Sequence, residues 1–355
     1  MKIIKLIKLI AVNFIVIILF LMLADPLLGL VLEDDPGISR EISFKENNPL
    51  SFAKVSSYDN NTEIEFVIKQ TDEHGFIIGP GDTSEKKIDI VFMGASTVEL
   101  ENVQENKRFP YLSIKNLNDS LNTNFVSRNA GVGGNLLSTT NLLLTTKVVP
   151  LHPKYVILSS SLIDMIYLSK NESYWTGSKK YLNRNNPKTE TFRGIKNMFF
   201  PNLWLQLRKY MGLSNDLEII KQAKFSPLNK SRILDQYEKQ LDVFINTCLI
   251  YGIKPILTTD YHVPKLIKAN LRKQGVFNDK ENQFYLTDLI PSLNNLIENK
   301  AKLYDIPLIK LHELIEQNKN FVNRNDGLHL TNTGSEKVSE TISDYLIDKF
   351  QNEKN

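Results

Sequence analysis

The residues best suited to chemistry lie in four short segments, of which the last, Asn325–Thr331, has the most informative spacing. In this segment Asp326 stands three residues before His329, with Gly327 between them. On a turn, such an Asp can orient the imidazole and stabilise its charged form. A His that merely lies on the surface is the alternative. The spacing therefore favours a pair suited to moving a proton.

A candidate nucleophile, Ser96, follows the buried run Ile88–Met93 and Gly94. A serine at a strand-to-helix turn presents its hydroxyl outward, and nearby backbone N–H groups can face an oxyanion. The pattern is not the Gly-x-Ser-x-Gly elbow, because position 98 is Val. A serine at this place also suits a helix N-cap, so the segment alone leaves both roles open.

The two remaining segments are rich in glycine and in serine. The run Asn129–Asn135 holds Gly131, Gly133 and Gly134, which allow close backbone approach and free N–H donors. Its spacing does not match the dinucleotide-binding fingerprint, and an ordinary turn is the alternative. The run Ser159–Asp164 ends in a carboxylate for which we favour the role of a helix cap, with substrate binding as the alternative.

Short apolar runs alternate with helical patterns from Lys87 onward. Such a pattern predicts a parallel sheet covered by helices on both faces. In open α/β sheets ligands bind beyond the carboxyl ends of the strands, and all four segments follow predicted strands. The predicted strands are residues 88–93, 124–127, 155–158, 254–258 and 307–309, and the clearest helices are 233–250 and 286–304.

In order and spacing, Ser96, the run Asn129–Gly134, the strand ending at Asp164 and the Asp326–His329 motif resemble the signature blocks of the SGNH (GDSL-type) hydrolase superfamily. The resemblance covers roughly residues 86–350. It implies a flavodoxin-like, three-layer α/β/α fold with a central parallel sheet. It also implies a triad of Ser96 as nucleophile, His329 as general base and Asp326 as orienting carboxylate. Backbone N–H groups of Ser96 and Gly134 would be the oxyanion donors, and neither a metal nor an organic cofactor is implied.

Two positions depart from the family pattern. Ala95 stands where the family usually has Asp, and Ile163 stands where it has an Asn that serves as third oxyanion donor. Losing one such donor costs about 10²–10³ in rate in measured cases. A hydroxyl of Ser160 or Ser161 is a candidate substitute.

The sequence therefore supports two hypotheses. The first is an exported serine esterase or acyltransferase of SGNH type, acting on acyl, most simply acetyl, esters of cell-envelope carbohydrate. The second is a catalytically silent SGNH-like domain that binds a glycan or an envelope-assembly partner. The departures at Ala95 and Ile163 favour the second.

The N-terminal residues 1–32 read as a membrane anchor. Three lysines precede sixteen uncharged, mostly apolar residues from Leu9 to Ala24, a helix of about 24 Å. The positive-inside rule places the lysines in the cytoplasm and the remainder outside the bacterial cytoplasmic membrane. A cleaved signal peptide is the alternative, although Met22-Leu23-Ala24 lacks a small residue at its first position.

Charge and composition exclude several classes of protein. The net charge of the 355 residues is +3, of which residues 1–32 supply +2, so the remainder is too balanced for a general nucleic-acid binder. The single cysteine, Cys248, excludes an intramolecular disulfide and a cysteine-clustered zinc site. His74, His152, His262 and His312 show no metal-like spacing.

Residues 33–85 read as an extended, β-rich linker, and residues 86–355 as the α/β domain. Within that domain, residues 165–232 form a predicted insertion with thirteen Lys or Arg against four Asp or Glu. Tyr167, Trp175 and Trp204 are candidates to stack on sugar rings, with a packed helical cap as the alternative. Basic residues of the insertion, among them Lys179, Lys180 and Arg184, are expected to favour an anionic glycan or lipid surface.

Overall fold

The computed structural model divides the chain into two compact units. One comprises Ser43–Thr176 and Lys224–Asn355, and the other comprises Met1–Ile42 and Gly177–Ala223. The residues that the structure describes are 12–14, 16–24, 46–56, 66–81, 87–159, 162–171, 173–174, 203, 230–273, 280, 284–324 and 326–352.

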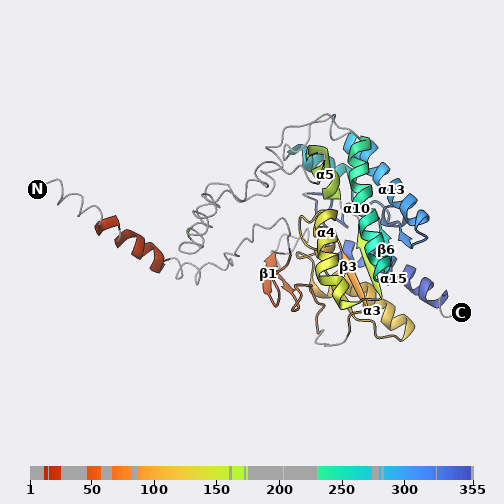
Figure 1. The fold of residues 1–355 in the computed structure, drawn as a ribbon, viewed down its shortest axis with the longest axis horizontal. Coiled ribbons are helices and arrows are strands. Elements are labelled where there is room, and N and C mark those ends of the chain that lie inside the picture. The colour runs from red at the N-terminus through yellow and green to blue at the C-terminus, as the bar shows by residue number, and fades with distance from the viewer. Residues whose placement is uncertain are drawn as a thin grey trace, which may run out of the picture. The chain divides into compact units, whose positions relative to one another are not determined.

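A five-stranded parallel sheet forms the centre of the larger unit (Figure 1). Its strands stand in the order β4-β3-β5-β6-β7, and every neighbouring pair is parallel. Numbered by their place in the chain, these strands have the flavodoxin-like order 2-1-3-4-5. The predicted parallel sheet and its flavodoxin-like topology are therefore confirmed. The strands are β3 (Ile90–Met93), β4 (Ser127–Asn129), β5 (Tyr155–Ser159), β6 (Lys254–Thr258) and β7 (Leu308–Ile309).

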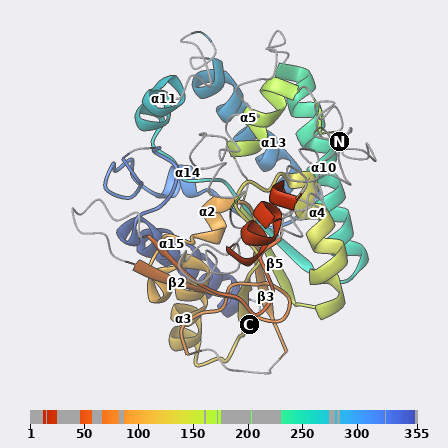
Figure 2. The same cartoon turned by 90° about the vertical axis from the view of Figure 1, so that its left-hand side faces the viewer.

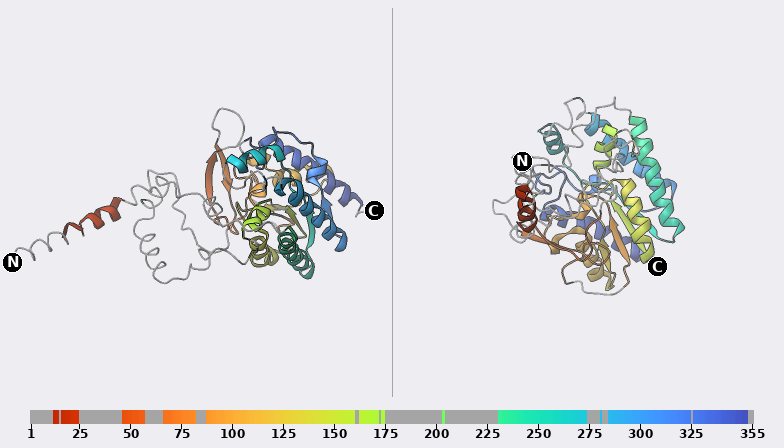
Figure 3. Two further views of the ribbon diagram at one scale, coloured as in Figure 1. Left: turned by 90° about the horizontal axis from the view of Figure 1, so that it is seen from above. Right: turned by 60° about the vertical axis from the view of Figure 1, so that its left-hand side comes forward.

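Helices cover both faces of this sheet, as Figures 2 and 3 show from three sides. One face carries α3 (Phe109–Leu121) and α15 (Asn332–Asn352), which pack against each other. The other face carries α4 (Leu137–Leu143), α10 (Lys230–Ile250) and α13 (Ile290–Leu303). Shorter helices lie near the carboxyl ends of the strands, namely α2 (Ser96–Glu99), α5 (Leu162–Asn171), α11 (Pro264–Lys273) and α14 (Leu311–Leu314).

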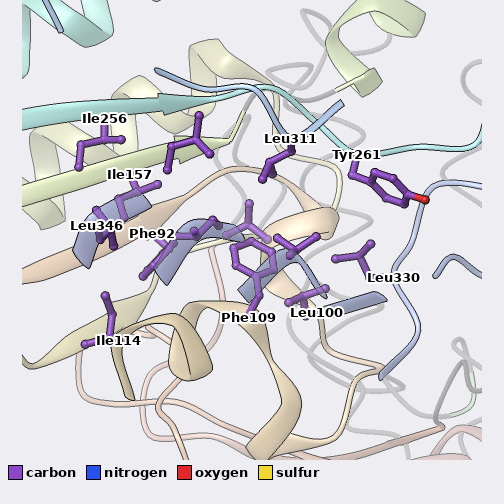
Figure 4. Close-up of a cluster of buried hydrophobic side chains, with 14 of the residues drawn as sticks. Phe92, Leu100, Phe109, Ile114, Ile157, Ile256, Tyr261, Leu311, Leu330 and Leu346 are labelled. Atoms are coloured by element: carbon purple, nitrogen blue, oxygen red, sulfur yellow. The ribbon is translucent and has the colours of Figure 1, made fainter. Parts of the chain in front are cut away.

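The main hydrophobic core lies between the sheet and the α3–α15 layer (Figure 4). Phe92 of β3 meets Phe109 of α3 edge to face, with ring centroids 5.9 Å apart at 76°. Ile157 of β5 and Leu346 of α15 complete this contact region. Each such buried side chain contributes about 1.5–3 kcal/mol, so the core fixes the strand that leads to Ser96.

The observed bounds correct two predictions. The strand predicted at residues 124–127 lies instead at Ser127–Asn129. The Asn118 side chain bonds both the N–H and the carbonyl of Phe125, at 2.9 Å each, and so holds that residue in a turn. The helix predicted at residues 286–304 opens with a π-helical turn, Tyr285–Leu289, before α13.

The described residues of the predicted linker pack against the sheet. Strands β1 (Phe52–Ser56) and β2 (Phe66–Gln70) form an antiparallel hairpin. Farther along, Ile77 exchanges two backbone hydrogen bonds with Asn129 at the edge of the sheet, at 2.8 and 3.1 Å. The sequence did not predict these contacts.

In the smaller unit, residues 12–14 and 16–24 are helical, and their large apolar side chains are mostly exposed. Among the residues that the structure describes, no helix combines the length and the apolar character needed to cross a membrane. Most of the predicted insertion, including Trp175, Trp204, Lys179, Lys180 and Arg184, lies outside the described residues.

Candidate active site

Ser96 stands where β3 gives way to α2. The N-cap of α2 is Ala95, and Ser96 is the first residue of the helix. The helix ends after one turn, because Leu100 adopts a left-handed conformation and its N–H bonds the Ser96 carbonyl. The alternative role of Ser96 as the N-cap is therefore wrong, and its hydroxyl remains available for another partner.

That partner is His329. Its Nε2 lies 2.8 Å from Ser96 Oγ, across 233 positions of the chain. Its Nδ1 lies 2.9 Å from Asp326 Oδ2. The other carboxylate oxygen, Oδ1, accepts the backbone N–H groups of Leu328 and His329 at 2.8 and 2.9 Å. The structure thus joins the three predicted residues in one continuous chain of hydrogen bonds.

The turn that carries Asp326 and His329 depends on Gly327. Its φ is +73°, and a Cβ built there would lie 2.5 Å from Leu266 Cβ, closer than side chains can approach. The Gly327 carbonyl also accepts the N–H of Val263, at 2.9 Å, from the segment that follows β6. Only glycine fits this close approach, which explains the residue between Asp326 and Leu328.

The electrostatic surroundings prepare His329 as a base. Burial lowers its pKa, but the hydrogen bond and charge of Asp326, with the charges of Asp260 and Glu101, raise the pKa above its ordinary value. A carboxylate on Nδ1 directs the lone pair of the neutral ring to Nε2, facing Ser96. The imidazole can therefore accept the hydroxyl proton and hold the charge that results.

Asp260 is a buried acid near the site that the sequence analysis missed. It follows β6, is 6% exposed, and its Oδ2 has no hydrogen-bond partner in the described part of the chain. Its pKa is raised to about 8, because the effect of burial exceeds the lowering by the charge of His329 and by the backbone N–H groups of Leu162 and Tyr261. Its place beyond the carboxyl end of a parallel strand was the signal that could have identified it.

The glycine loop lies against α2. The Val132 N–H bonds the Gly94 carbonyl at 3.2 Å, and a Cβ on Gly133 would lie 3.9 Å from that of Ser96. Gly134 is exposed and has a φ of +73°. Within the described residues, the backbone N–H groups of Ser96 and Gly134 make no hydrogen bond. Both are therefore available to a ligand.

Asp164, a candidate for substrate binding, has a different role. It is buried, and its Oδ1 accepts the N–H of Leu137, at the start of α4, at 2.8 Å and the hydroxyl of Tyr174 at 2.5 Å. Burial raises its pKa to about 7, although both hydrogen bonds lower it. The favoured prediction that Asp164 caps a helix is therefore confirmed, because its carboxylate accepts the first N–H of α4.

The other candidates divide into one described residue and several that the structure does not describe. Tyr167 is half-buried in α5 and stacks on Tyr174, with ring centroids 6.4 Å apart. Ser160, Ser161, Trp175 and Trp204 lie outside the described residues.

Ala95 lines a hollow of about 200 Å³ with Asn135, Asp164 and Tyr237.

One group in the described part of the chain has the composition of a metal site. It comprises Glu298, His312 and Glu313, whose ligand atoms lie within 4.8 Å of one another. The Nζ of Lys310 lies 2.8 Å from Glu298 and 3.5 Å from Glu313. Lys310 already pairs with both carboxylates and offsets one of their two charges, so they do not form a convincing cation site.

The strand order, with Ser96 and His329 beyond the ends of its strands, is the arrangement that the sequence resemblance implies. The fold is therefore a flavodoxin-like α/β/α fold. Solved structures similar to this chain include an acetyl xylan esterase, AlAXEase, at 15% identity and a TM-score of 0.44, covering 73% of this chain and 100% of that one. A GDSL-like lipase from Bacteroides thetaiotaomicron matches at 14% identity and a TM-score of 0.38, covering 76% of this chain and 92% of that one. A lipase/acylhydrolase from Enterococcus faecalis matches at 13% identity and a TM-score of 0.41, covering 74% of this chain and 97% of that one.

No protein-family model and no curated protein matches the chain. The chemistry of the site therefore follows from its own residues.

Proposed function

We propose that the protein is a serine ester hydrolase of SGNH type, with Ser96, His329 and Asp326 as its catalytic triad. The observation that carries this proposal is the continuous hydrogen-bonded chain from Asp326 through His329 to Ser96. A nucleophile bonded to a base, which is itself oriented by a carboxylate, is the arrangement that activates a serine hydroxyl.

The proposed reaction has two steps. Ser96 Oγ attacks the ester carbonyl while His329 Nε2 takes its proton, and the backbone N–H groups of Ser96 and Gly134 face the oxyanion. His329 then gives the proton to the leaving alcohol, which leaves an acyl group on Ser96. In the second step His329 takes a proton from water, which attacks the acyl carbon. The bond between the acyl carbon and Ser96 Oγ then breaks, His329 returns the proton to Oγ, and the acid is released. A carbohydrate hydroxyl in place of water would make the same site an acyltransferase.

The oxyanion site should have two backbone donors and no side-chain donor from position 163. The side chain of Ile163 cannot donate a hydrogen bond, and one missing donor lowers the rate about 10²–10³-fold in comparable sites. The proposal therefore includes a low turnover on simple esters. The reduced donor set is also the observation that favours the second candidate, a catalytically silent binding domain.

For the substrate class we propose acyl esters, most simply acetyl esters, of cell-envelope carbohydrate. The support is indirect and comes from the N-terminus. Three lysines precede an apolar run, and in the described helix of that run Phe14, Phe20 and Leu23 are each more than 60% exposed. These features support a domain exported across the bacterial cytoplasmic membrane and tethered to it. Full-length protein should then pellet with membranes and resist carbonate extraction, whereas recovery of a soluble chain starting near Asp25 would contradict the tether.

The deciding experiment is covalent labelling of the wild-type protein with a fluorophosphonate, located by mass spectrometry. Ser96 should be labelled, and Ser96→Ala should abolish both the label and hydrolysis of p-nitrophenyl acetate. Ser56→Ala, on the β1–β2 hairpin, is a matched control that should change neither result. Folded protein with unlabelled Ser96 and a hydrolysis rate equal to that of Ser96→Ala would overturn the hydrolase and favour the binding domain.

A further inference from the structure

Glu99 is a buried carboxyl one turn beyond Ser96, and the proposed reaction does not use it. The residue is 4% exposed and lies at the end of α2. Lys69 of β2 reaches it from the hairpin, with Nζ 2.5 Å from Glu99 Oε1, and contacts Glu101 at 3.3 Å. Burying an ion pair has a desolvation cost that is recovered only when further hydrogen bonds satisfy both partners. The question is what else Glu99 holds.

The other contact of the Glu99 carboxylate is the glycine loop. The backbone N–H of Gly133 faces this carboxylate and lowers its pKa. The two lie so close that a Cβ on Gly133 would be 2.7 Å from Glu99 Oε2. Gly133 immediately precedes Gly134, whose N–H is the second proposed oxyanion donor. Glu99 thus fixes the residue on which the direction of that N–H depends.

A single guanidinium anchors both ends of the Lys69–Glu99 pair. Arg108, which is buried, donates from Nη2 to the carbonyl of Ile68 at 2.6 Å and from Nε to the carbonyl of Leu100 at 3.0 Å. Ile68 precedes Lys69, and Leu100 follows Glu99. The hairpin strand and the helix that carries Ser96 are therefore held at a fixed separation.

We propose that Lys69 and Glu99 are a positioning pair, through which the N-terminal hairpin holds Gly133 and Gly134 in the geometry that binds the oxyanion. This inference rests on the proposed esterase function. It gives Lys69, which lies in a region predicted to be a linker, a role in the active site. Neither side chain touches the reacting atoms, so both act through the glycine loop.

The charge of Lys69 is what keeps Glu99 able to accept two hydrogen bonds. Burial and the neighbouring charge of Glu101 raise the pKa of Glu99, whereas Lys69 and the Gly133 N–H lower it. Without Lys69 the carboxyl group is driven toward its protonated form. One oxygen then becomes a donor and no longer holds the loop as a carboxylate does.

The test compares Lys69→Met with Lys54→Met, a control on the opposite, exposed face of the same hairpin. Lys69→Met should lower kcat on p-nitrophenyl acetate about 10- to 100-fold, part of the 10²–10³ attributed to a lost oxyanion donor, with KM nearly unchanged. Lys69→Arg should restore most of the loss. Hydrogen exchange in the peptide Gly131–Asn135 should accelerate in Lys69→Met alone.

A second variant covers the case in which Lys69→Met does not fold. The double variant Lys69→Met/Glu99→Leu buries no charge, so it should fold, but it offers the Gly133 N–H no acceptor. It should still show low kcat and fast exchange at the loop. Wild-type kcat and wild-type exchange in this folded variant would overturn the positioning role. If wild-type Ser96 is not labelled by fluorophosphonate, the esterase fails separately, and the exchange data alone decide whether the pair holds the loop.

Discussion

Replacing Asp326 by Asn tests whether the carboxylate sets the tautomer of His329. The carboxylate accepts three hydrogen bonds, two of them through Oδ1 from the backbone N–H groups of Leu328 and His329. In Asp326→Asn the amide oxygen must take that position. The opposite rotamer would lose both bonds and set an NH₂ group against two donors, at about 1–3 kcal/mol for each unsatisfied group. The amide NH₂ is therefore forced toward His329 Nδ1.

An NH₂ at Nδ1 fixes the wrong tautomer. His329 must then carry its proton on Nε2, which donates to Ser96 Oγ, at 2.8 Å in the native site, and can no longer accept from it. The same substitution in a serine protease triad lowers kcat about 10⁴-fold, equivalent to about 5.5 kcal/mol of barrier. We expect a loss of that order here, with the thermal unfolding midpoint little changed.

The assay is steady-state hydrolysis of p-nitrophenyl acetate, with fluorophosphonate labelling as a second readout of Ser96. Asp119→Asn is the matched control, because Asp119 is exposed and pairs with Lys115 one turn away. A folded Asp326→Asn protein that keeps kcat within tenfold of wild type would refute the reasoning. In that case either the tautomer is not controlled by Asp326, or His329 is not the base.

Three further predictions follow from the same region. The surroundings of His329 raise its pKa, so kcat/KM should fall as pH drops through a midpoint above the ordinary histidine pKa. A midpoint below the ordinary pKa would contradict the assignment of His329 as the base. Gly327→Ala should destabilise the fold by about 1–3 kcal/mol in urea unfolding and should lower kcat. Gly252 has a similar φ of +69° but open space around it, so Gly252→Ala is the control and should lose only the smaller free energy of backbone strain. Burial holds the pKa of Asp260 at about 8 in the folded state, far above the ordinary value for an aspartate. The native state therefore retains a proton that the unfolded chain releases, so the stability that this proton contributes is full below the unfolded pKa and is lost as pH rises toward 8. Asp260→Asn should remove that loss between pH 5 and 8.5, and equal slopes for the two proteins in urea unfolding would count against the buried acid.

The central strands could be predicted because they obey local rules, and the roles of Ser96, His329 and Asp326 were predicted from the resemblance to SGNH hydrolases. Strands buried on both faces are short apolar runs, such as the one that became Ile90–Met93 and the one at Tyr155–Ser159. Polar residues that directly follow such runs must lie at one edge of a parallel sheet. Ser96 could therefore be placed at this edge from its position alone, whereas the Asp326–His329 motif lies well beyond the last strand and was placed there with the help of the family resemblance.

The remaining features depend on contacts that no local pattern encodes. Strand β4 is the polar triplet Ser127–Asn129, and it belongs to the sheet because of its pairing with β3 and Ile77. Lys69 looks like an ordinary solvated lysine in sequence, and only the packing of the hairpin turns it toward Glu99. Asp164 and Asp260 could be located beyond strand ends, but whether each meets a helix N–H or a histidine depends on tertiary placement.

The long separation between Ser96 and His329 determines when the protein can become active during its own synthesis. The base arrives on a turn immediately before α15, and that helix is fastened to α3 by bonds such as Ser335 Oγ accepting the Phe109 N–H at 2.8 Å. A growing chain carries the nucleophile for more than two hundred residues before its partner exists. Closing so long a loop is among the slower events of folding. On the proposed chemistry, every nascent or prematurely terminated chain that stops before His329 is inert toward esters, and activity begins only when the last helix docks.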